Sequence, residues 1–392
     1  MEAMRDMTTP TVIRDVTATA LSVPVSGGAR LGIGRVVKRD TVLVRVTAQD
    51  GSVGWGEAHH ARAADVVALA VNSVIRPLCL GRSVDDVVGL WQAAYAAQFK
   101  SHGLGATAVM ALSGVDMALW DLRARRAGVP LYRLLGGGAR RIPAYAGGVS
   151  LGWQAPEALV EEALALIHQG YQALKLRVGE SPEADLVRVA AVRRAFPAVT
   201  IMVDANTEYS LEDVRQVMPA FAELGVAWLE EPFPPHDHRR YAAARALGSI
   251  PLAAGENHYT RFEFHRLVED GVVGILQPDL SKCGGVTEML RIAALASAWK
   301  LPICPHSSLT GLNMAATIHV LASLDNAGYF EADVSRGNLF RTEMGTPPYV
   351  LAPEDGTVSP LERPGIGVEI DEAFVAAHPF RAGPAFVDIR HT

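Results

Sequence analysis

Hydrophobic and polar residues follow two different patterns along the chain. The first part mixes strand-like alternation, at residues 11–24 and 41–56, with longer helical periodicity, and an Asp-Gly turn interrupts the second run. The helical patterns cover residues 62–76, 84–98 and 107–127. The last of these is apolar on nearly every side, which predicts a buried helix. We therefore expect an α+β domain over residues 1–140.

From residue 141 onward the pattern becomes repetitive. Short apolar runs alternate with amphipathic helical stretches, and the runs cover residues 143–149, 172–178, 199–204, 226–230, 251–256, 273–277, 301–305 and 328–331. Eight strands with intervening helices predict an α/β fold with a TIM-like (β/α) barrel over residues 141–335. An open doubly wound sheet is the alternative, but no Gly-x-Gly-x-x-Gly motif follows the first strand. Residues 336–392 are rich in Pro and Gly and should pack back on the other parts.

Composition narrows the range of partners. The chain has 392 residues, 49% of them hydrophobic, and a net charge of −6 without a basic tail, so we expect no nucleic-acid partner. It shows neither a signal-like segment nor about 18 consecutive apolar residues, so we expect a cytoplasmic protein without a membrane partner. The three cysteines, Cys79, Cys283 and Cys304, form no Cys-x-x-Cys pair. We interpret them as core thiols, with a redox role as the alternative.

Three acidic residues end consecutive apolar runs in the repetitive part. Asp204, Glu230 and Glu256 follow one another at intervals of 26 residues. Parallel strands in such a repeat end on one rim, so the three carboxylates should converge there. Hard oxygen ligands around one point predict a divalent cation, Mg²⁺, with one ion per subunit. Each acid could instead cap the following helix, but the matched spacing of all three favours the metal site.

Further titratable residues stand at other strand ends. Asp279 and His306 end consecutive strands, and an Asp beside a His fixes its tautomer and raises its basicity, as in a general base. The alternative is a core His bonded to the backbone. Lys175 and Arg177 lie two residues apart and so share one face of a strand. The Lys could bind a carboxylate or act as a base, whereas the Arg stays protonated and suits a carboxylate or an oxyanion. Both could otherwise be surface cations.

Several longer motifs accompany these residues: Gly-Trp-Gly-Glu at 54–57, read as a turn, the helix at 111–122, Pro-Leu-Tyr-Arg-Leu-Leu-Gly-Gly at 130–137, and the Val-Asp-Ala-Asn, Glu-Glu-Pro, Gly-Glu-Asn, Gln-Pro-Asp and Pro-His strand ends. Together they resemble the mandelate racemase and muconate lactonising enzyme family of the enolase superfamily, over nearly the whole chain. The resemblance implies a modified (β/α)₇β barrel with an N-terminal capping domain that the C-terminal segment completes. It also implies Mg²⁺ at the three acids, a carboxylate substrate deprotonated at its α carbon to a metal-stabilised enediolate, and a homo-oligomer, either a dimer or an octamer.

The Asp279–His306 pair resembles the mandelate racemase subgroup, since the muconate lactonising subgroup carries a Lys where this chain has Asp279. Glu331 resembles the carboxyl group that hydrogen-bonds the enediolate in that subgroup. Asn206 resembles a residue that supports the site or contacts substrate. Lys282 lies beyond the strand end in Ser-Lys-Cys-Gly-Gly, and we do not assign it as a base.

The chain departs from the racemase pattern at Lys175-x-Arg177, where racemases of the subgroup carry Lys-x-Lys. Inversion at the α carbon needs an acid or base on each face of the enediolate, and Arg meets that need poorly. Elimination of a β-hydroxyl needs one base. The pattern therefore favours a Mg²⁺-dependent dehydratase of an aldonate or aldarate that yields a 2-keto-3-deoxy acid. A racemase, epimerase or cycloisomerase acting through the same enediolate is the alternative, and a non-catalytic metal-binding barrel is a third hypothesis.

Loops of the capping domain should contact the rest of the substrate. Residues 24–35 are rich in Gly and are predicted to form a flexible flap. His59, His60 and Arg62, together with His258 from the barrel, should line the site as polar, cationic groups. Such a lining suits a hydroxylated acid or a diacid better than an aromatic acid, although each residue could equally be solvated surface.

Overall fold

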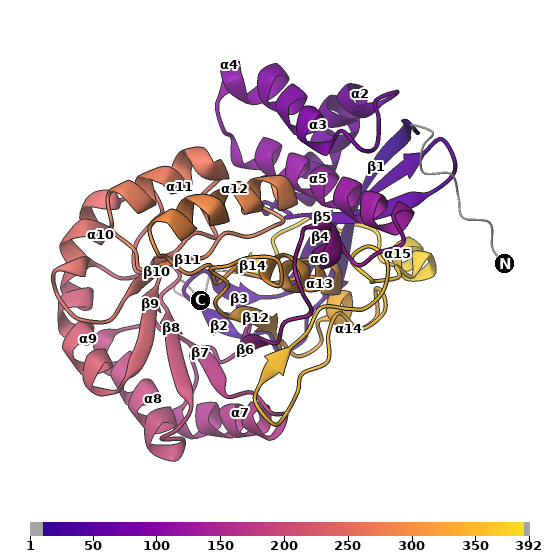
Figure 1. Ribbon diagram of the computed structural model, residues 1–392. Helices are drawn as coiled ribbons and strands as arrows, with labels where there is room; N and C mark the ends of the chain where they lie inside the picture. Colours follow the sequence, from indigo (N-terminus) through magenta and orange to yellow (C-terminus); the bar gives the residue numbers. More distant parts are fainter. Residues whose placement is uncertain (1–10, 388–392) are drawn as a thin grey trace.

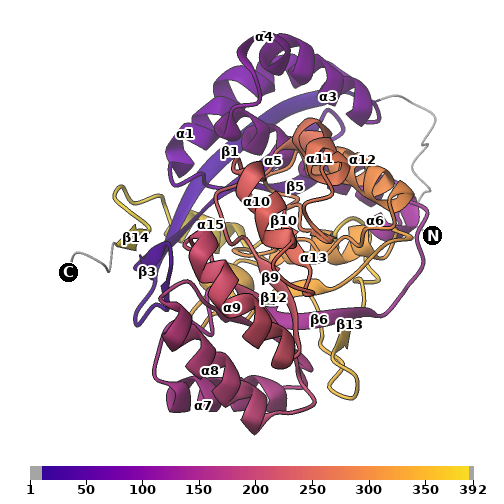
Figure 2. The same ribbon diagram turned by 90° about the vertical axis from the view of Figure 1, so that its left-hand side faces the viewer.

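The computed structural model describes residues 11–387. Figure 1 shows a large unit, in which helices surround a ring of parallel strands, beside a smaller unit built from the N-terminal part of the chain. Figure 2 shows that strand β1 of the smaller unit extends along the side of the larger one. Within the described residues, no helix combines the length and the apolar character needed to cross a bilayer.

The smaller unit is an antiparallel sheet covered by helices. The sheet has the order β1–β4–β5, and its strands are β1 (Ile13–Pro24), β4 (Lys38–Ala48) and β5 (Val53–Ala58). The predicted Asp-Gly turn joins β4 to β5 at Gly51, whose φ is 86°. The helices are α1 (Ala64–Ala70), α2 (Arg76–Cys79), α3 (Val87–Ala94), α4 (Lys100–His102), α5 (Ala106–Arg126) and α6 (Leu131–Leu134), with π-helical segments at Val71–Ile75 and Tyr95–Phe99.

The Gly-Trp-Gly-Glu motif is part of strand β5, so the turn predicted at residues 54–57 is wrong. Its glycines serve close packing instead. A Cβ atom on Gly54 would lie 2.2 Å from the carbonyl oxygen of Ala118, and one on Gly56 would lie 2.2 Å from that of Gly114, both in α5. Any larger side chain would push the helix away from the sheet, so the motif sets the distance between β5 and the buried helix α5.

The larger unit is a TIM-like arc of seven parallel strands, which confirms the predicted α/β fold. The strand order is β11–β10–β9–β8–β7–β6–β12. The strands are β6 (Ile142–Gly147), β7 (Ala173–Arg177), β8 (Thr200–Asp204), β9 (Val226–Glu230), β10 (Leu252–Ala254), β11 (Ile275–Leu276) and β12 (Phe330–Asp333). The helices between them are α7 (Pro156–His168), α8 (Pro182–Ala195), α9 (Leu211–Glu223), α10 (His238–Arg245), α11 (Thr260–Glu269), α12 (Gly285–Ala298) and α13 (Gly311–Leu321).

The strand predicted at residues 301–305 is reduced to single bridges. Ile303 pairs with Leu276 on one side and with Ala327 on the other. Pro302 and Pro305 flank it and have no N–H to donate to a ladder, so the strand cannot extend in either direction. The bridges nevertheless hold this segment between β11 and the chain that leads into β12, and so place the residues that follow it on the rim.

The C-terminal segment contacts both units. Strand β13 (Thr357–Val358) pairs with β6, and β14 (Phe386–Val387) pairs with β3 (Gly34–Val36) of the β2–β3 hairpin, in which β2 is Arg30–Leu31. Two short helices, α14 (Leu339–Thr342) and α15 (Glu372–Ala377), lie between these strands. The predicted flap at residues 24–35 thus contains β2 and the first two residues of β3, which pairs with β14. The three-part division of the chain stays a prediction.

The barrel interior is apolar at its base and charged above it. Tyr145, Trp228 and Tyr329 pack edge to edge, with ring centroids 5.7–6.3 Å apart. The side chain of Cys304 belongs to the same cluster, and all three cysteines are free and buried, as a core interpretation requires. The charged layer consists of strand-end residues and forms the floor of the site.

Candidate active site

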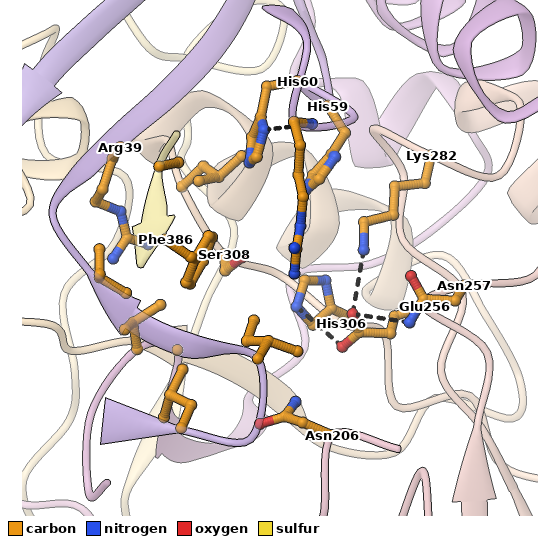
Figure 3. A pocket seen from close by; sticks show the side chains of 18 of the residues that line it. Arg39, His59, His60, Asn206, Glu256, Asn257, Lys282, His306, Ser308 and Phe386 are labelled. Atoms are coloured by element: carbon orange, nitrogen blue, oxygen red, sulfur yellow. Dashed lines mark hydrogen bonds and ion pairs between the residues drawn. The ribbon is translucent and has the colours of Figure 1, made fainter. Parts of the chain in front are cut away.

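A cavity of about 200 Å³ lies between the strand ends of the barrel and the capping unit. Figure 3 shows His306, Glu256 and Lys282 on one side of it and Arg39 and Phe386 on the other. Five non-Gly residues of the described chain line this cavity at positive φ: Arg62 (59°), Asn206 (45°), Thr207 (70°), Glu231 (36°) and Leu309 (96°). Strained backbone at such a rim is typical of functional sites, because only surrounding structure can hold it there.

His306 is positioned as a base by a buried carboxylate. Its Nδ1 lies 2.6 Å from Asp279 Oδ2, while Asp279 Oδ1 accepts hydrogen bonds from the backbone N–H and the hydroxyl of Ser281, at 2.7 and 2.6 Å. A carboxylate accepts only, so in the neutral ring the proton sits on Nδ1 and Nε2 carries the lone pair, 3.3 Å from Glu256 Oε2. Burial lowers the pKa of His306, but the nearby Glu256 and the bond to Asp279 outweigh it, so the pKa is raised.

Lys175 lies at the centre of a carboxylate cluster. Its Nζ is 2.8 Å from Glu230 Oε1, 2.9 Å from Glu331 Oε1 and 3.4 Å from Asp204 Oδ2. The side chain is fully buried. Burial opposes its charge, but the three carboxylates raise the pKa of Lys175 above its ordinary value. A lysine held in this way keeps its proton, and it is not among the residues that line the cavity.

The predicted metal ligands come from neighbouring strands. Asp204 stands opposite Glu230 in the register of β8 and β9, and Glu230 stands opposite Ala253 in β10, three residues before Glu256. Burial raises the pKa of Glu230 to about 7; Lys175 opposes the shift, and repulsion from Asp204, Glu331 and Glu256 adds to it. The carboxylates are therefore close enough to destabilise one another as anions.

The donor chemistry of this cluster fits a hard divalent cation. In residues 11–387 no three His, Cys, Asp or Glu side chains are grouped tightly enough to hold an ion. Each predicted ligand is paired with a cationic side chain. Glu230 pairs with Lys175, Asp204 with Arg177, and Glu256 with Lys282 at 3.2 Å. The assignment of Asp204, Glu230 and Glu256 to the metal thus stays a prediction.

Arg177 lines the cavity with its donors already directed at acceptors. One amino group donates to Asp204 and to Asn206 Oδ1, the latter at 3.3 Å, and the other donates to the carbonyl of Gly148. Burial opposes its charge, but Asp204 and three glutamates raise the pKa of Arg177. The side chain is a fixed cation that can neither accept nor release a proton at accessible pH. Glu331 is not among the residues that line the cavity; it accepts from the N–H of Gly148, which does line it, at 2.9 Å.

The structure brings most of the predicted substrate residues to the cavity. His59, His60, Arg62 and Asn206 all line it. His258 does not: the turn that joins His258 N to Gly255 O at 3.0 Å directs the side chain away from the rim. The ring lies against Phe264, with Nε2 3.1 Å from the carbonyl oxygen of Pro235. The predicted contact of His258 with substrate is therefore not supported.

Lys282 lines the cavity, although the sequence did not mark it. The N–H groups of Lys282 and Cys283 both bond to the carbonyl of Asp279, at 3.0 and 2.8 Å, which forms one helical turn. Three residues along such a turn return a side chain to the same face. The Nζ of Lys282 and the Nε2 of His306 then flank Glu256, at 3.2 and 3.3 Å from its two oxygens. The i, i+3 spacing from Asp279 was the signal that could have found it.

Two family models match the chain. Residues 13–136 match the N-terminal domain of mandelate racemase/muconate lactonizing enzyme, and residues 158–374 match the enolase C-terminal domain-like model. The chain belongs to the mandelate racemase/muconate lactonizing enzyme family. It is an enzyme of the enolase superfamily, and the sequence resemblance is confirmed.

Relatives within the family share most of their length with this chain. A D-galactonate dehydratase from Verminephrobacter eiseniae is 34% identical over 353 residues, which cover 85% of this chain and 90% of the relative. A solved member of the enolase superfamily from Polaromonas sp. JS666 is 48% identical, with a TM-score of 0.93 and coverage of 96% and 100%. A solved racemase from Streptomyces coelicolor A3(2) with bound magnesium is 29% identical, with a TM-score of 0.86 and coverage of 94% and 99%. Other relatives at 31–34% identity are named as dehydratases or cycloisomerases of sugar acids.

Proposed function

We propose that this family member is a Mg²⁺-dependent dehydratase of an acid sugar, an aldonate or an aldarate. The observation that carries the proposal is that the cavity has a His base oriented by a buried carboxylate, His306 on Asp279, and a fixed cation at Arg177. Lys175 does not reach the cavity and keeps its proton between three carboxylates. The site thus has the base that elimination needs and lacks, at strand β7, the second base that inversion would need.

The proposed reaction begins when His306 Nε2 removes the proton from C2 of the substrate. Asp279 stabilises the imidazolium that forms, since it accepts from Nδ1 and keeps its charge. The electron pair of the broken C–H bond moves through the enediolate and expels the C3 hydroxyl, which takes a proton from His306 and leaves as water. The resulting enol becomes a 2-keto-3-deoxy acid, and His306 is neutral again.

Cationic groups beside the substrate carboxylate would support this step. Arg177 supplies hydrogen-bond donors in the cavity wall, and the buried charge of Lys175 stabilises the negative charge that develops. Magnesium held by Asp204, Glu230 and Glu256 would add positive charge at the same carboxylate. The magnesium-bound relative supports this choice of metal.

Cycloisomerisation through the same enediolate is the second proposal, because it too needs a single base and relatives of similar identity are named for it. One experiment separates the two. The purified enzyme with Mg²⁺ is incubated in D₂O with a panel of aldonates, aldarates and their lactones. A 2-keto acid formed at the rate of substrate loss supports dehydration. Deuterium at C2 without keto acid refutes it, and isomerised lactone without release of water establishes the alternative.

His306→Asn tests the assigned base. It should abolish both keto-acid formation and exchange at C2, whereas a variant with unchanged turnover would show that the base lies elsewhere.

A further inference from the structure

The cavity is chemically different at its two ends. The acids that line it, Glu231 and Glu256, come from strand ends of the barrel. The opposite wall comes from the capping unit and from the end of the described chain, and no acidic side chain of residues 11–387 contributes to it. Its charged and titratable groups are cations and imidazoles, and the Ser308 hydroxyl lies beside Phe386. Figure 3 shows Arg39, His60 and Phe386 together on this side, away from Glu256 and His306.

Arg39, on β4, is a buried cation with unused donor capacity. Only 4% of the residue is exposed. One amino group donates to Asp333, but its Nε is buried and has no hydrogen-bond partner within the described chain. Asp333 does not serve Arg39 alone, since its oxygens also accept from the N–H of Leu309 at 3.2 Å and from the Asn338 amide at 3.2 Å. The charge of Arg39 is thus paired, but a buried N–H without an acceptor is costly, and an anionic ligand in the cavity would supply that acceptor.

The neighbouring imidazoles also present donors. His60 Nδ1 accepts from the N–H of Arg62 at 2.9 Å, and His59 Nδ1 accepts from the N–H of Ala61 at 3.1 Å. A neutral imidazole that accepts at Nδ1 carries its proton on Nε2. Burial, together with the charges of Lys282, Arg39, Arg62 and Lys38, lowers the pKa of His60 to about 3. His60 is therefore a neutral donor at physiological pH, surrounded by positive charge.

Arg62 adds a second guanidinium at the mouth. It is exposed, and its guanidinium lies 5.2 Å from the ring centroid of Phe386. No ion pair of Arg62 occurs within residues 11–387, whereas Lys38, which lines the same wall, is paired with Asp40 at 2.9 Å. Asp333 and Asp40, which pair with Arg39 and Lys38, do not line the cavity, so no carboxylate of the described chain faces the substrate from this wall. Such a wall does not suit a terminal hydroxymethyl group, which both donates and accepts. It suits a carboxylate, which only accepts.

We propose that Arg39, His60 and Arg62 form a second anion subsite that binds the far carboxylate of the substrate. The substrate is then a dicarboxylic sugar acid, one carboxylate lying at the metal end and the other on the capping wall. This inference rests on the proposed function, because it takes the metal end as the place of the reacting carboxylate. Of the two substrate classes in the proposed function, the second subsite favours the aldarate, which has a carboxylate at each end, over the aldonate.

The test compares matched acids that differ only at the far carbon: D-galactonate with D-galactarate, and D-gluconate with D-glucarate. In the wild type, kcat/KM should favour the diacid by about 10-fold or more. Arg39→Met should lower kcat/KM for the diacid by about 10- to 100-fold, whereas kcat/KM for the monoacid should change by less than about 3-fold. If Arg39→Met folds poorly, Arg62→Gln replaces it as the test variant. Arg62 is exposed, and its substitution should also lower kcat/KM for the diacid more than for the monoacid. Arg35→Gln is the matched control, because it removes an exposed positive charge from β3 outside the cavity.

Binding to the base-deficient His306→Asn variant separates this inference from the proposed function. Titration calorimetry with Mg²⁺ should show tighter binding of the diacid, and His306→Asn/Arg39→Met should lose that difference. If the wild type dehydrates neither acid but this binding difference holds, the subsite stands and the dehydratase proposal falls. If monoacids are dehydrated as well as diacids and Arg39→Met affects both equally, the subsite is refuted and the dehydratase stands. If 6-phosphogluconate binds more tightly than glucarate, the subsite binds a phosphate and the proposed far carboxylate is refuted. If no acid binds, both proposals fail.

Discussion

The orientation of His306 depends on one carboxylate, and Asp279→Asn tests that dependence. Asp279 is fully buried and uses both oxygens: Oδ2 accepts from His306 Nδ1, and Oδ1 accepts from the N–H and the hydroxyl of Ser281. An Asn side chain has only one oxygen. If that oxygen faces His306, the amide NH₂ opposes the N–H of Ser281, donor against donor. If the NH₂ faces His306, Nδ1 must accept, and the proton moves to Nε2, where it abolishes the base.

The magnitude follows from these two orientations. Loss of a charge-assisted hydrogen bond costs about 1.5–3 kcal/mol, which corresponds to about 10- to 150-fold in rate. Loss of the base itself removes a contribution of about 10²- to 10⁴-fold. The bonds to Ser281 favour the second orientation, so we expect kcat for Asp279→Asn to fall by about 10²- to 10⁴-fold. Ser281→Ala is the control: it removes one neutral donor and keeps the charge, so kcat should fall by no more than about 10-fold.

Two readouts check the reasoning. Keto-acid formation from the best acid of the panel gives kcat, and deuterium incorporation at C2 reports proton abstraction by itself. Both should fall together in Asp279→Asn, and adding His306→Asn should cause little further loss, because the two residues act as one unit. A kcat within about 3-fold of the wild type, in a variant with the wild-type unfolding midpoint, would refute the proposed role of the pair.

The remaining predictions concern the metal, the pH dependence of stability and the packing of the two units. Mg²⁺ should raise the free energy of unfolding by about 2.7 kcal/mol at one hundred times its Kd, and calorimetry should find this gain lost in Glu230→Gln; a retained gain would contradict the ligand assignment. Burial lowers the pKa of His319 to about 4, so the unfolded chain takes up the proton first and stability falls by roughly 3 kcal/mol as the pH drops from about 6.5 to about 4. His319→Gln should flatten the urea-unfolding profile in that window, and an unaltered slope would exclude this residue. Gly56→Ala would place a methyl 2.2 Å from the carbonyl of Gly114 and should cost about 1–3 kcal/mol in urea, whereas Gly138→Ala, which meets nothing within 4 Å, should leave stability nearly unchanged.

Sequence periodicity was sufficient for the strands of the barrel because each one is buried between helices and must be apolar. The predicted runs at 199–204 and 226–230 correspond to β8 and β9 within one residue. Periodicity failed to predict the extent of strand pairing where proline residues remove backbone N–H donors. The run at 301–305 is as apolar as the others, yet Pro302 and Pro305 restrict pairing to Ile303.

Site residues were predictable where a strand directs them and unpredictable where a turn does. Lys175 and Arg177 are separated by the two-residue period of a strand, and their shared face follows from it. Lys282 and His258 lie in turns whose direction depends on the hydrogen bonds to Asp279 O and Gly255 O. Those bonds form only in the folded chain. One helical turn directed Lys282 into the cavity, and one tight turn directed His258 out of it.

The shared face of Lys175 and Arg177 does not give them a shared environment, and this difference carries the proposed chemistry. Lys175 Nζ is enclosed by three carboxylates, so it contributes buried charge and exchanges no proton with a substrate in the cavity. Arg177 lines the cavity, but a guanidinium cannot act as the second base. Lys282 is also held by a carboxylate, since burial opposes its charge but Glu256 and Asp279 raise its pKa. Of the two groups that flank Glu256, His306 is therefore the one that can exchange a proton with substrate. On the proposed function, an enediolate formed here meets fixed positive charge at β7 and a single base at His306, so expelling a β-hydroxyl is easier than delivering a proton from the other face.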